Sequence, residues 1–133
     1  AFADAHHVRF TTIDEIIETC DFISIHLPLI PETQHLLNYE CMSRMKKNAI
    51  LVNTARGGII NEDDLVRILE EKKIYGAGLD VFQHEPASES PLLNFKNVVV
   101  GSHCAASTEG AVENMSNFAV DNLIEAFKKR GLL

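Results

Sequence analysis

The chain has 133 residues, which is enough for one domain with a substantial core, and its composition is ordinary for a globular protein. Its formal net charge of −7 argues against nucleic acid or an anionic membrane surface as a partner. No apolar stretch is long enough to span a bilayer. Cys20, Cys41 and Cys104 are scattered and lack metal-ligand spacing, so we expect free thiols in a reducing compartment such as the cytoplasm, and no metal site.

Residues 1–48 predict short strands and helices. Thr12 and Glu15 form a capping-box pattern, and isoleucines follow them at helical spacing. Pro28 ends an apolar, β-branched run, and Asn38 is a favourable N-cap for a further helix. The elements expected here are, in order, a strand over 6–10, a helix from Thr12 to about Cys20, a strand over 21–27, a helical turn over 33–37 and a helix over 38–45.

The central stretch, residues 49–61, predicts a buried strand, a tight turn and the start of a helix. An apolar run over 49–52 is typical of a parallel strand that is buried on both faces. Gly57 and Gly58 allow a sharp turn, and Asn61 is a favourable N-cap before three acidic residues. Arg56 is therefore a cation just beyond the carboxyl end of a strand, where ligands bind in open α/β sheets. The alternative for Arg56 is a surface arginine paired with a local acid.

The second half of the chain continues the alternation. We expect a helix over 62–73, a strand over 76–81, a loop over 82–95, a buried strand over 97–102 and a long helix ended by Gly131. Ser107 or Thr108 is the expected N-cap of that last helix. Its broad apolar face is larger than one sheet can cover, so we expect the helix to pack on another domain or on a second subunit. Strands alternating with helices predict a parallel, doubly wound α/β sheet.

Polar residues end four of the predicted strands: His26, residues 54–56, Asp80 and His103. A parallel sheet presents all four ends at one edge. Arg56, Glu85 and His103 are then a plausible catalytic trio, because arginine can hold a carboxylate by two hydrogen bonds and imidazole can exchange a proton near neutral pH. Such a trio suits proton transfer at a carbon that bears a hydroxyl or carbonyl next to a carboxylate. Each residue alone also has a plain structural explanation, as a solvated, capping or packing group.

Four segments together resemble the D-isomer-specific 2-hydroxyacid dehydrogenases, in the second half of their nucleotide-binding domain. They occur in the order and spacing of that family, and the amino-acid sequence around residues 59–62 and 106–109 is most similar to phosphoglycerate dehydrogenase-type members. The segments are Ile25-His26-Leu27-Pro28-Leu29, Leu51-Val52-Asn53-Thr54-Ala55-Arg56-Gly57-Gly58, Gly78-Leu79-Asp80-Val81-Phe82 with Glu85-Pro86, and His103 with Ala106-Ser107-Thr108.

This resemblance implies an NAD-dependent oxidoreductase that acts on a small 2-hydroxyacid, as a homodimer. Arg56 would orient the substrate carboxylate, His103 would be the acid/base, and Glu85 would pair with His103. Asp80 would hold the nicotinamide carboxamide. Further residues implied to line NAD, beside Arg56 and His103, are Leu27, Thr54, Ala55, Cys104, Ala105 and Ala106. Ser102 departs from the family, which usually has proline before the histidine, and Cys104 replaces a common aliphatic residue.

The Gly-x-Gly-x-x-Gly segment and the acidic ribose-binding residue of the family do not occur in this sequence. We therefore expect residues 1–133 to be a partial NAD-binding domain, an incomplete Rossmann-like sheet that lacks its first two strands, with the substrate domain absent. Residues 21–27 would then form an exposed edge strand. The chain alone should bind NAD poorly and have little activity. The alternatives are an NAD(H)-responsive interaction module, like a corepressor, and a nonfunctional truncated product.

Overall fold

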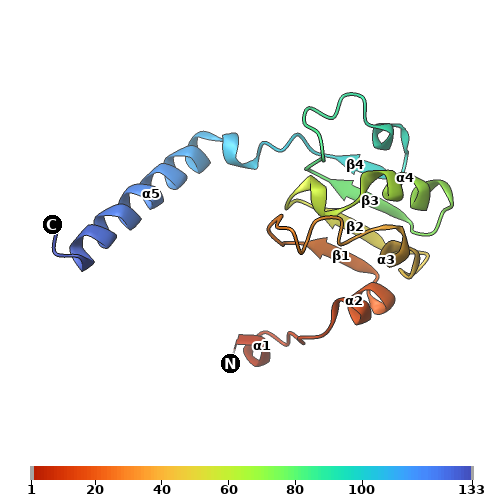
Figure 1. Cartoon of the computed structure of the whole chain (residues 1–133), viewed down its shortest axis with the longest axis horizontal. Coiled ribbons are helices and arrows are strands. Elements are labelled where there is room, and N and C mark those ends of the chain that lie inside the picture. Colours follow the sequence, from red (N-terminus) through yellow and green to blue (C-terminus); the bar gives the residue numbers. More distant parts are fainter. Residues whose placement is uncertain (1, 133) are drawn as a thin grey trace. The chain divides into compact units, whose positions relative to one another are not determined.

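The computed structural model describes residues 2–132, and the chain divides into two compact units between Ser102 and His103 (Figure 1). The first unit contains α1 (Phe2–Ala5), α2 (Ile13–Thr19), β1 (Phe22–Ile25), α3 (Tyr39–Ser43), β2 (Ile50–Asn53), η1 (Gly57–Ile59), α4 (Glu62–Glu70), β3 (Gly76–Leu79), η2 (Pro91–Asn94) and β4 (Val98–Val100). The second unit contains η3 (Ala105–Ser107) and α5 (Glu109–Lys129).

The four strands form one parallel sheet in the order β1-β2-β3-β4 (Figure 1). Each strand lies beside the one that precedes it in the chain, so every crossover advances in the same direction across the sheet. Because such crossovers are right-handed, α3, α4 and η2 all fall on one face. This arrangement confirms the expected α/β, Rossmann-like class with a long C-terminal helix, and the described strands wind in one direction only.

The two faces of this sheet differ sharply in burial. Residues that the register aligns on the helix-covered face form the core, which includes Ile23, Ile25, Leu51, Asn53, Ala77 and Leu79. On the opposite face the side chains of Phe22 and Val99 are 74% and 75% exposed. Within the described residues of the first unit, one face of the sheet therefore carries the core and the other is open.

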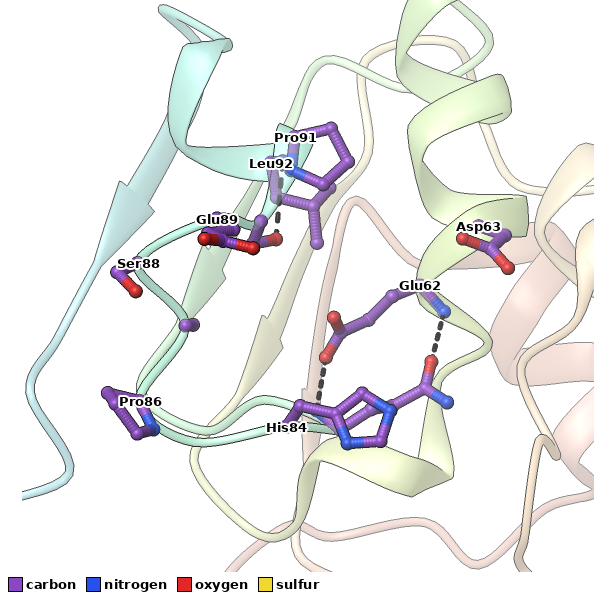
Figure 2. Close-up of a pocket in the computed structure, with 11 residues that line it drawn as sticks. Glu62, Asp63, His84, Pro86, Ser88, Glu89, Pro91 and Leu92 are labelled. Carbon is purple, nitrogen blue, oxygen red and sulfur yellow. Dashed lines mark hydrogen bonds between the residues drawn. The ribbon is translucent and has the colours of Figure 1, made fainter.

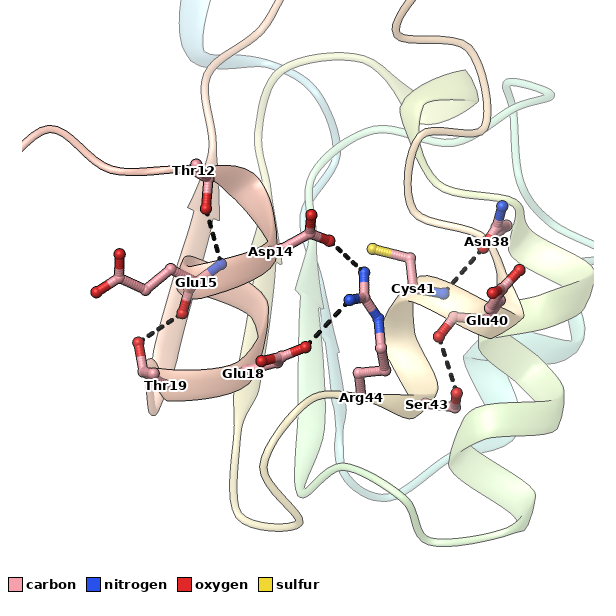
Figure 3. Close-up of polar contacts among 10 residues, drawn as sticks. All are labelled: Thr12, Asp14, Glu15, Glu18, Thr19, Asn38, Glu40, Cys41, Ser43 and Arg44. Atoms are coloured by element: carbon pink, nitrogen blue, oxygen red, sulfur yellow. Dashed lines mark hydrogen bonds and ion pairs between the residues drawn. The ribbon is translucent and has the colours of Figure 1, made fainter.

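Short polar side chains start the helices, as their positions in the sequence predict. Thr12 Oγ1 accepts a hydrogen bond from the Glu15 N–H (3.2 Å), and Asn38 Oδ1 accepts one from the Cys41 N–H (2.9 Å) (Figure 3). Asn61 Oδ1 likewise accepts from the first turn of α4 (3.2 Å). These bonds satisfy backbone donors that have no partner inside the helix.

Arg44 joins α2 to α3 across the covered face. Its guanidinium donates to Asp14 Oδ1 (2.5 Å) and to Glu18 Oε1 (3.1 Å) (Figure 3). All three side chains are substantially exposed, so water screens both pairs and each contributes little to stability. Nearby, burial raises the pKa of the Cys41 thiol, and the guanidinium of Arg44 opposes that change.

Several predicted elements differ from the structure. Residues 6–10 are not a strand: they follow α1 as a turn and extended chain, and Phe10 is 85% exposed. His7 has a φ of +54°, which interrupts an extended run, and no described strand pairs with this segment. The strand after residue 97 exists as β4, but Val99 and Val100 are exposed, because β4 is an edge strand of the described sheet.

The helix expected over 62–73 ends three residues earlier than its hydrophobic pattern suggests. Lys72 adopts a φ of +54°. Its N–H donates a hydrogen bond to the Leu69 carbonyl (3.1 Å), and the Lys73 N–H donates one to the Ile68 carbonyl (3.0 Å). This pair of bonds is a Schellman motif, with lysine in the position that usually holds glycine. The segment over 33–37 forms a turn at 31–35, and Leu37 then makes a parallel bridge with Ile60.

The second unit is dominated by α5, whose N-cap is Thr108, with its Oγ1 accepting from the Ala111 N–H (3.2 Å). Gly131 follows the helix with a φ of +67°. None of the α5 side chains is buried in this chain; Phe118 is 69% exposed and Leu123 55%. Among the described residues, no helix is long and apolar enough to cross a membrane.

Candidate functional site

The turn after β2 is built by one buried amide. Asn53 is 1% exposed and is the buried polar side chain of the described core. Its Nδ2 donates to the Arg56 carbonyl (2.9 Å), and its Oδ1 accepts from the Ala55 N–H (3.0 Å). Asn53 therefore closes the backbone around Thr54, Ala55 and Arg56 through its own side chain. The three residues predicted to form the site at this strand end all lie on that closed turn.

Arg56 is exposed at the edge of the sheet. Its Nη1 donates to the Ala55 carbonyl (2.6 Å), and no ion pair joins it to an acidic side chain in the part of the chain that the structure describes. The alternative of a surface arginine paired with a local acid is therefore not what this structure shows. The guanidinium keeps donors that are free to bind an anion from outside the fold.

Gly57 lets the Arg56 turn pack directly on the loop after β3. A Cβ at Gly57 would lie less than 3.0 Å from the Phe82 carbonyl and from the Gln83 nitrogen. Real Cβ atoms essentially never approach other atoms so closely. In the same loop the Phe82 N–H donates to Glu85 Oε1 (3.0 Å). The backbone next to Arg56 and the loop that carries Glu85 are therefore in direct contact.

Asp80 follows β3 at the same edge of the sheet. Its N–H donates to the Asn53 carbonyl (3.0 Å), and the Gly101 N–H donates to the Leu79 carbonyl (2.8 Å). A Cβ at Gly101 would overlap Asp80 Oδ1, so glycine at 101 leaves room for this carboxylate. The expectation that Asp80 lies beside the ends of the neighbouring strands is confirmed by these bonds.

Two pockets open near these residues. One, of about 320 Å³, lies at the carboxyl end of β1; Leu27 and His26 line it together with Ile13, Ile17 and other apolar side chains. The other, of about 410 Å³, lies between the start of α4 and the loop over 83–92 and is lined by Glu62, Asp63, Gln83, His84 and Glu89 among others (Figure 2). The first is apolar and the second is rich in acidic groups.

The predicted trio is divided between the two units. Arg56 and Glu85 belong to the first unit, as does Asp80, whereas His103 begins the second. His103 is exposed and has a φ of +53°, which is unusual for a residue other than glycine. After it, Cys104, Ala105 and Ala106 form an exposed turn in which the Ser107 N–H donates to the Cys104 carbonyl (2.9 Å). In the described residues, no group of three or more His, Cys, Asp or Glu side chains is placed to hold a metal ion.

Sequence reasoning did not single out Asn53 or Gln83. An amide directly after a buried apolar strand was the available indication for Asn53, because its short side chain can hydrogen-bond its own backbone two or three residues on. No local pattern marks Gln83, whose partners are Glu62 and His35, 21 and 48 residues away.

Comparison with protein-family models decides the family. Residues 2–105 match the model described as "D-isomer specific 2-hydroxyacid dehydrogenase, NAD binding domain". The chain belongs to this family. As a member of the D-isomer specific 2-hydroxyacid dehydrogenases, it carries all four sequence segments that suggested the resemblance.

Individual relatives agree with the family. The chain is 43% identical to glyoxylate/hydroxypyruvate reductase B of Salmonella paratyphi B over 126 residues, which are 94% of this chain and 39% of that protein. The structure is similar to a glyoxylate reductase from Paecilomyes thermophila, with a TM-score of 0.85, 34% identity and coverage of 95% of this chain and 38% of the other. It is also similar to D-lactate dehydrogenase with NAD+ from Lactobacillus jensenii, with a TM-score of 0.80, 30% identity and coverage of 90% and 40%. The chain thus spans about two fifths of the length of these relatives.

Proposed function

We propose that this chain is part of an NAD-dependent oxidoreductase that transfers a hydride between nicotinamide and a small D-2-hydroxyacid or 2-ketoacid. The observation that carries the proposal is the exposed guanidinium of Arg56, on a turn that packs against the loop of Glu85. The relatives are named for glyoxylate, hydroxypyruvate and D-lactate, which share a carboxylate beside the reacting carbon. The phosphoglycerate-type substrate suggested by the sequence shares that group and stays a prediction.

In this mechanism Arg56 holds the substrate carboxylate through two parallel hydrogen bonds. His103 gives a proton to the carbonyl oxygen during reduction and takes it from the hydroxyl during oxidation. Glu85 pairs with the imidazole and favours its protonated form.

The residues present suit NAD. When bound, NAD supplies or accepts the hydride. Leu27 lines an apolar pocket at the end of β1, and Gly101 leaves space at the Asp80 carboxylate, so both fit the roles implied by the family. Thr54, Ala55, Cys104, Ala105 and Ala106 complete the proposed set, with Arg56 and His103.

We also propose that residues 1–133 are one part of an NAD-binding domain, that the substrate domain lies outside them, and that the chain alone binds NAD weakly and has little activity. Its coverage of 39% of the reductase from Salmonella paratyphi B supports this division. A reducing compartment such as the cytoplasm is proposed from the sequence, in which Cys20, Cys41 and Cys104 are odd in number and scattered. A homodimer is proposed from the family alone.

The test is turnover in a longer protein that contains residues 1–133, with glyoxylate, hydroxypyruvate and a phosphorylated hydroxyacid as separate substrates. Arg56→Lys should weaken transition-state binding by roughly 2–4 kcal/mol in kcat/KM, because lysine lacks the planar fork. Unchanged kcat/KM in this variant would remove Arg56 from the site.

The role of Glu85 is tested by the pH profile of the same protein. Glu85→Gln removes the charge that favours protonated His103, so the limb of the kcat/KM profile that reports the imidazole should shift to lower pH. A limb in the wild-type position would show that Glu85 does not act on His103.

A second candidate is an NAD(H)-responsive interaction module. The open face of the sheet and the exposed apolar side chains of α5 favour it, because apolar surface of this kind marks protein contacts. Binding of a protein partner that depends on NAD(H), with no turnover of any hydroxyacid, would support this candidate over the enzyme.

A further inference from the structure

Two reciprocal hydrogen bonds join the first residue of α4 to the loop that carries Glu85. The Glu62 N–H donates to Gln83 Oε1 (2.8 Å), and the Gln83 N–H donates to Glu62 Oε1 (2.5 Å) (Figure 2). Gln83 Nε2 also lies 3.2 Å from His35 Nε2, in the turn that precedes α3. Glu62 and Gln83 are both half-buried, so these bonds are shielded from competing water. We call this arrangement the Glu62–Gln83 clasp.

The clasped backbone contacts both halves of the candidate site in the first unit. On one side, the Phe82 N–H donates to Glu85 Oε1 (3.0 Å). On the other side, Phe82 and Gln83 lie so close to Gly57 that no Cβ fits between them. Arg56 immediately precedes Gly57. A shift of residues 82–83 would therefore move the Glu85 carboxylate and the backbone beside Arg56 relative to each other.

We propose that Gln83, held by Glu62, is a positioning residue that fixes the Glu85 loop against the Arg56 turn. This inference rests on the proposed function, in which those two side chains act on one substrate. Gln83 itself contacts neither substrate nor cofactor in this assignment. Its effect is geometric, since a displacement of about 1 Å at a site of this kind lowers the rate by about a hundredfold.

The charge of Glu62 is not what the clasp requires. Burial raises the pKa of the Glu62 carboxyl, and the Gln83 N–H and His84 lower it, while Asp63 and Glu85 raise it. An amide oxygen at position 62 would accept the same hydrogen bond without the burial of a charge. Glu62→Gln is therefore the conservative variant, whereas Gln83→Ala and Glu62→Ala each remove the side-chain acceptor of one of the two reciprocal bonds.

The first measurement is amide hydrogen exchange by NMR in the 133-residue chain. In Gln83→Ala and Glu62→Ala, the Phe82 amide should exchange about five- to tenfold faster, as loss of one or two hydrogen bonds implies, while the amides of Leu51 and Leu79 in the central strands keep their rates. Glu62→Gln should stay near the wild type. Asp63→Ala, which removes the adjacent acid of the same pocket, is the matched control and should also stay near it. An unchanged Phe82 rate, or a rise matched by Leu51 and Leu79, would overturn the proposal.

The second measurement uses the same variants in a longer protein that contains residues 1–133. Gln83→Ala should lower kcat for the hydroxyacid by about tenfold and leave KM for NAD unchanged, and Glu62→Gln should keep the wild-type kcat that Glu62→Ala loses. Unchanged kcat in both alanine variants would overturn the positioning role. A wild-type protein without turnover would instead refute the proposed function, and the exchange rate of Phe82 would still decide whether the clasp holds the loop.

Discussion

Replacement of Gly57 by alanine tests how the Arg56 turn is packed. The backbone of Gly57 does not lie in the left-handed region, so alanine can adopt it, and the penalty is purely steric. The atoms in the way are the Phe82 carbonyl and the Gln83 nitrogen, which are backbone and cannot rotate aside like a side chain. Overpacking costs about 1–3 kcal/mol, and the lower entropy of the unfolded alanine chain offsets about 0.5 kcal/mol. We expect a net loss of about 2 kcal/mol.

The assay is urea unfolding of the 133-residue chain followed by far-ultraviolet circular dichroism. With a slope of about 1.5 kcal/mol per molar urea, the midpoint of Gly57→Ala should fall by about 1.3 M. The matched control is Gly58→Ala, whose new Cβ would meet only the flexible Leu29 side chain, at 3.1 Å, and should change stability by less than about 0.5 kcal/mol. A Gly57→Ala midpoint equal to that of the wild type, or an equal loss in Gly58→Ala, would refute the packing argument.

Two further predictions concern stability. Asn53→Ala leaves the Ala55 N–H and the Arg56 carbonyl without their buried partner, so the free energy of unfolding in urea should fall by about 2–3 kcal/mol; a loss under about 0.5 kcal/mol would contradict the role of this amide. The hydrogen bond from the Tyr39 hydroxyl, followed by that from Arg67, lowers the pKa of the Glu71 carboxyl. Because the unfolded chain then binds the proton more tightly, the stability that Glu71 contributes is present above its usual value of 4.5 and is lost as the pH falls through the folded pKa. Unfolding measured over a series of acidic pH values should show a flatter dependence in Glu71→Gln than in the wild type, and identical slopes would exclude this linkage.

Local chemistry predicted the helix starts well. Thr12, Asn38, Asn61 and Thr108 each accept the backbone hydrogen bond that their positions suggested, because an N-cap depends only on residues two or three positions away. The parallel sheet could be predicted equally well, because short apolar runs that alternate with helical patterns are compatible with few other folds.

Features that depend on a distant partner could not be predicted in this way. The segment over 6–10 has an extended pattern, but a strand needs a neighbour to take its backbone hydrogen bonds, and the described sheet begins at β1. Val99 is apolar and was expected to be buried, yet its burial depends on what covers an edge strand. Gln83 belongs to the same class, since its importance comes from Glu62, which is 21 residues earlier in the chain.

The part of the candidate site that lies just beyond the strand ends could be predicted from the sequence. Arg56 and Asp80 lie beyond β2 and β3, and Gly57 brings the loop of Glu85 onto the Arg56 turn. The place of His103, at the first position of the second unit, depends on the connection between units rather than on any strand. Its function therefore remains a prediction from family resemblance.

The strictly consecutive order of the strands also has a consequence for how the sheet is made. Each strand pairs with the one synthesised just before it, so no strand has to wait for a later segment to complete its hydrogen bonds on that side. Pairing between successive strands closes smaller loops than pairing between strands far apart in the chain, so its entropic cost is lower. On the ribosome, β2 can add to β1, then β3 to β2 and β4 to β3, as each helical connection emerges. The turn of Arg56 would be set as soon as β2 and η1 have formed, and the arrival of the Phe82 loop would then lock it before α5 has been translated.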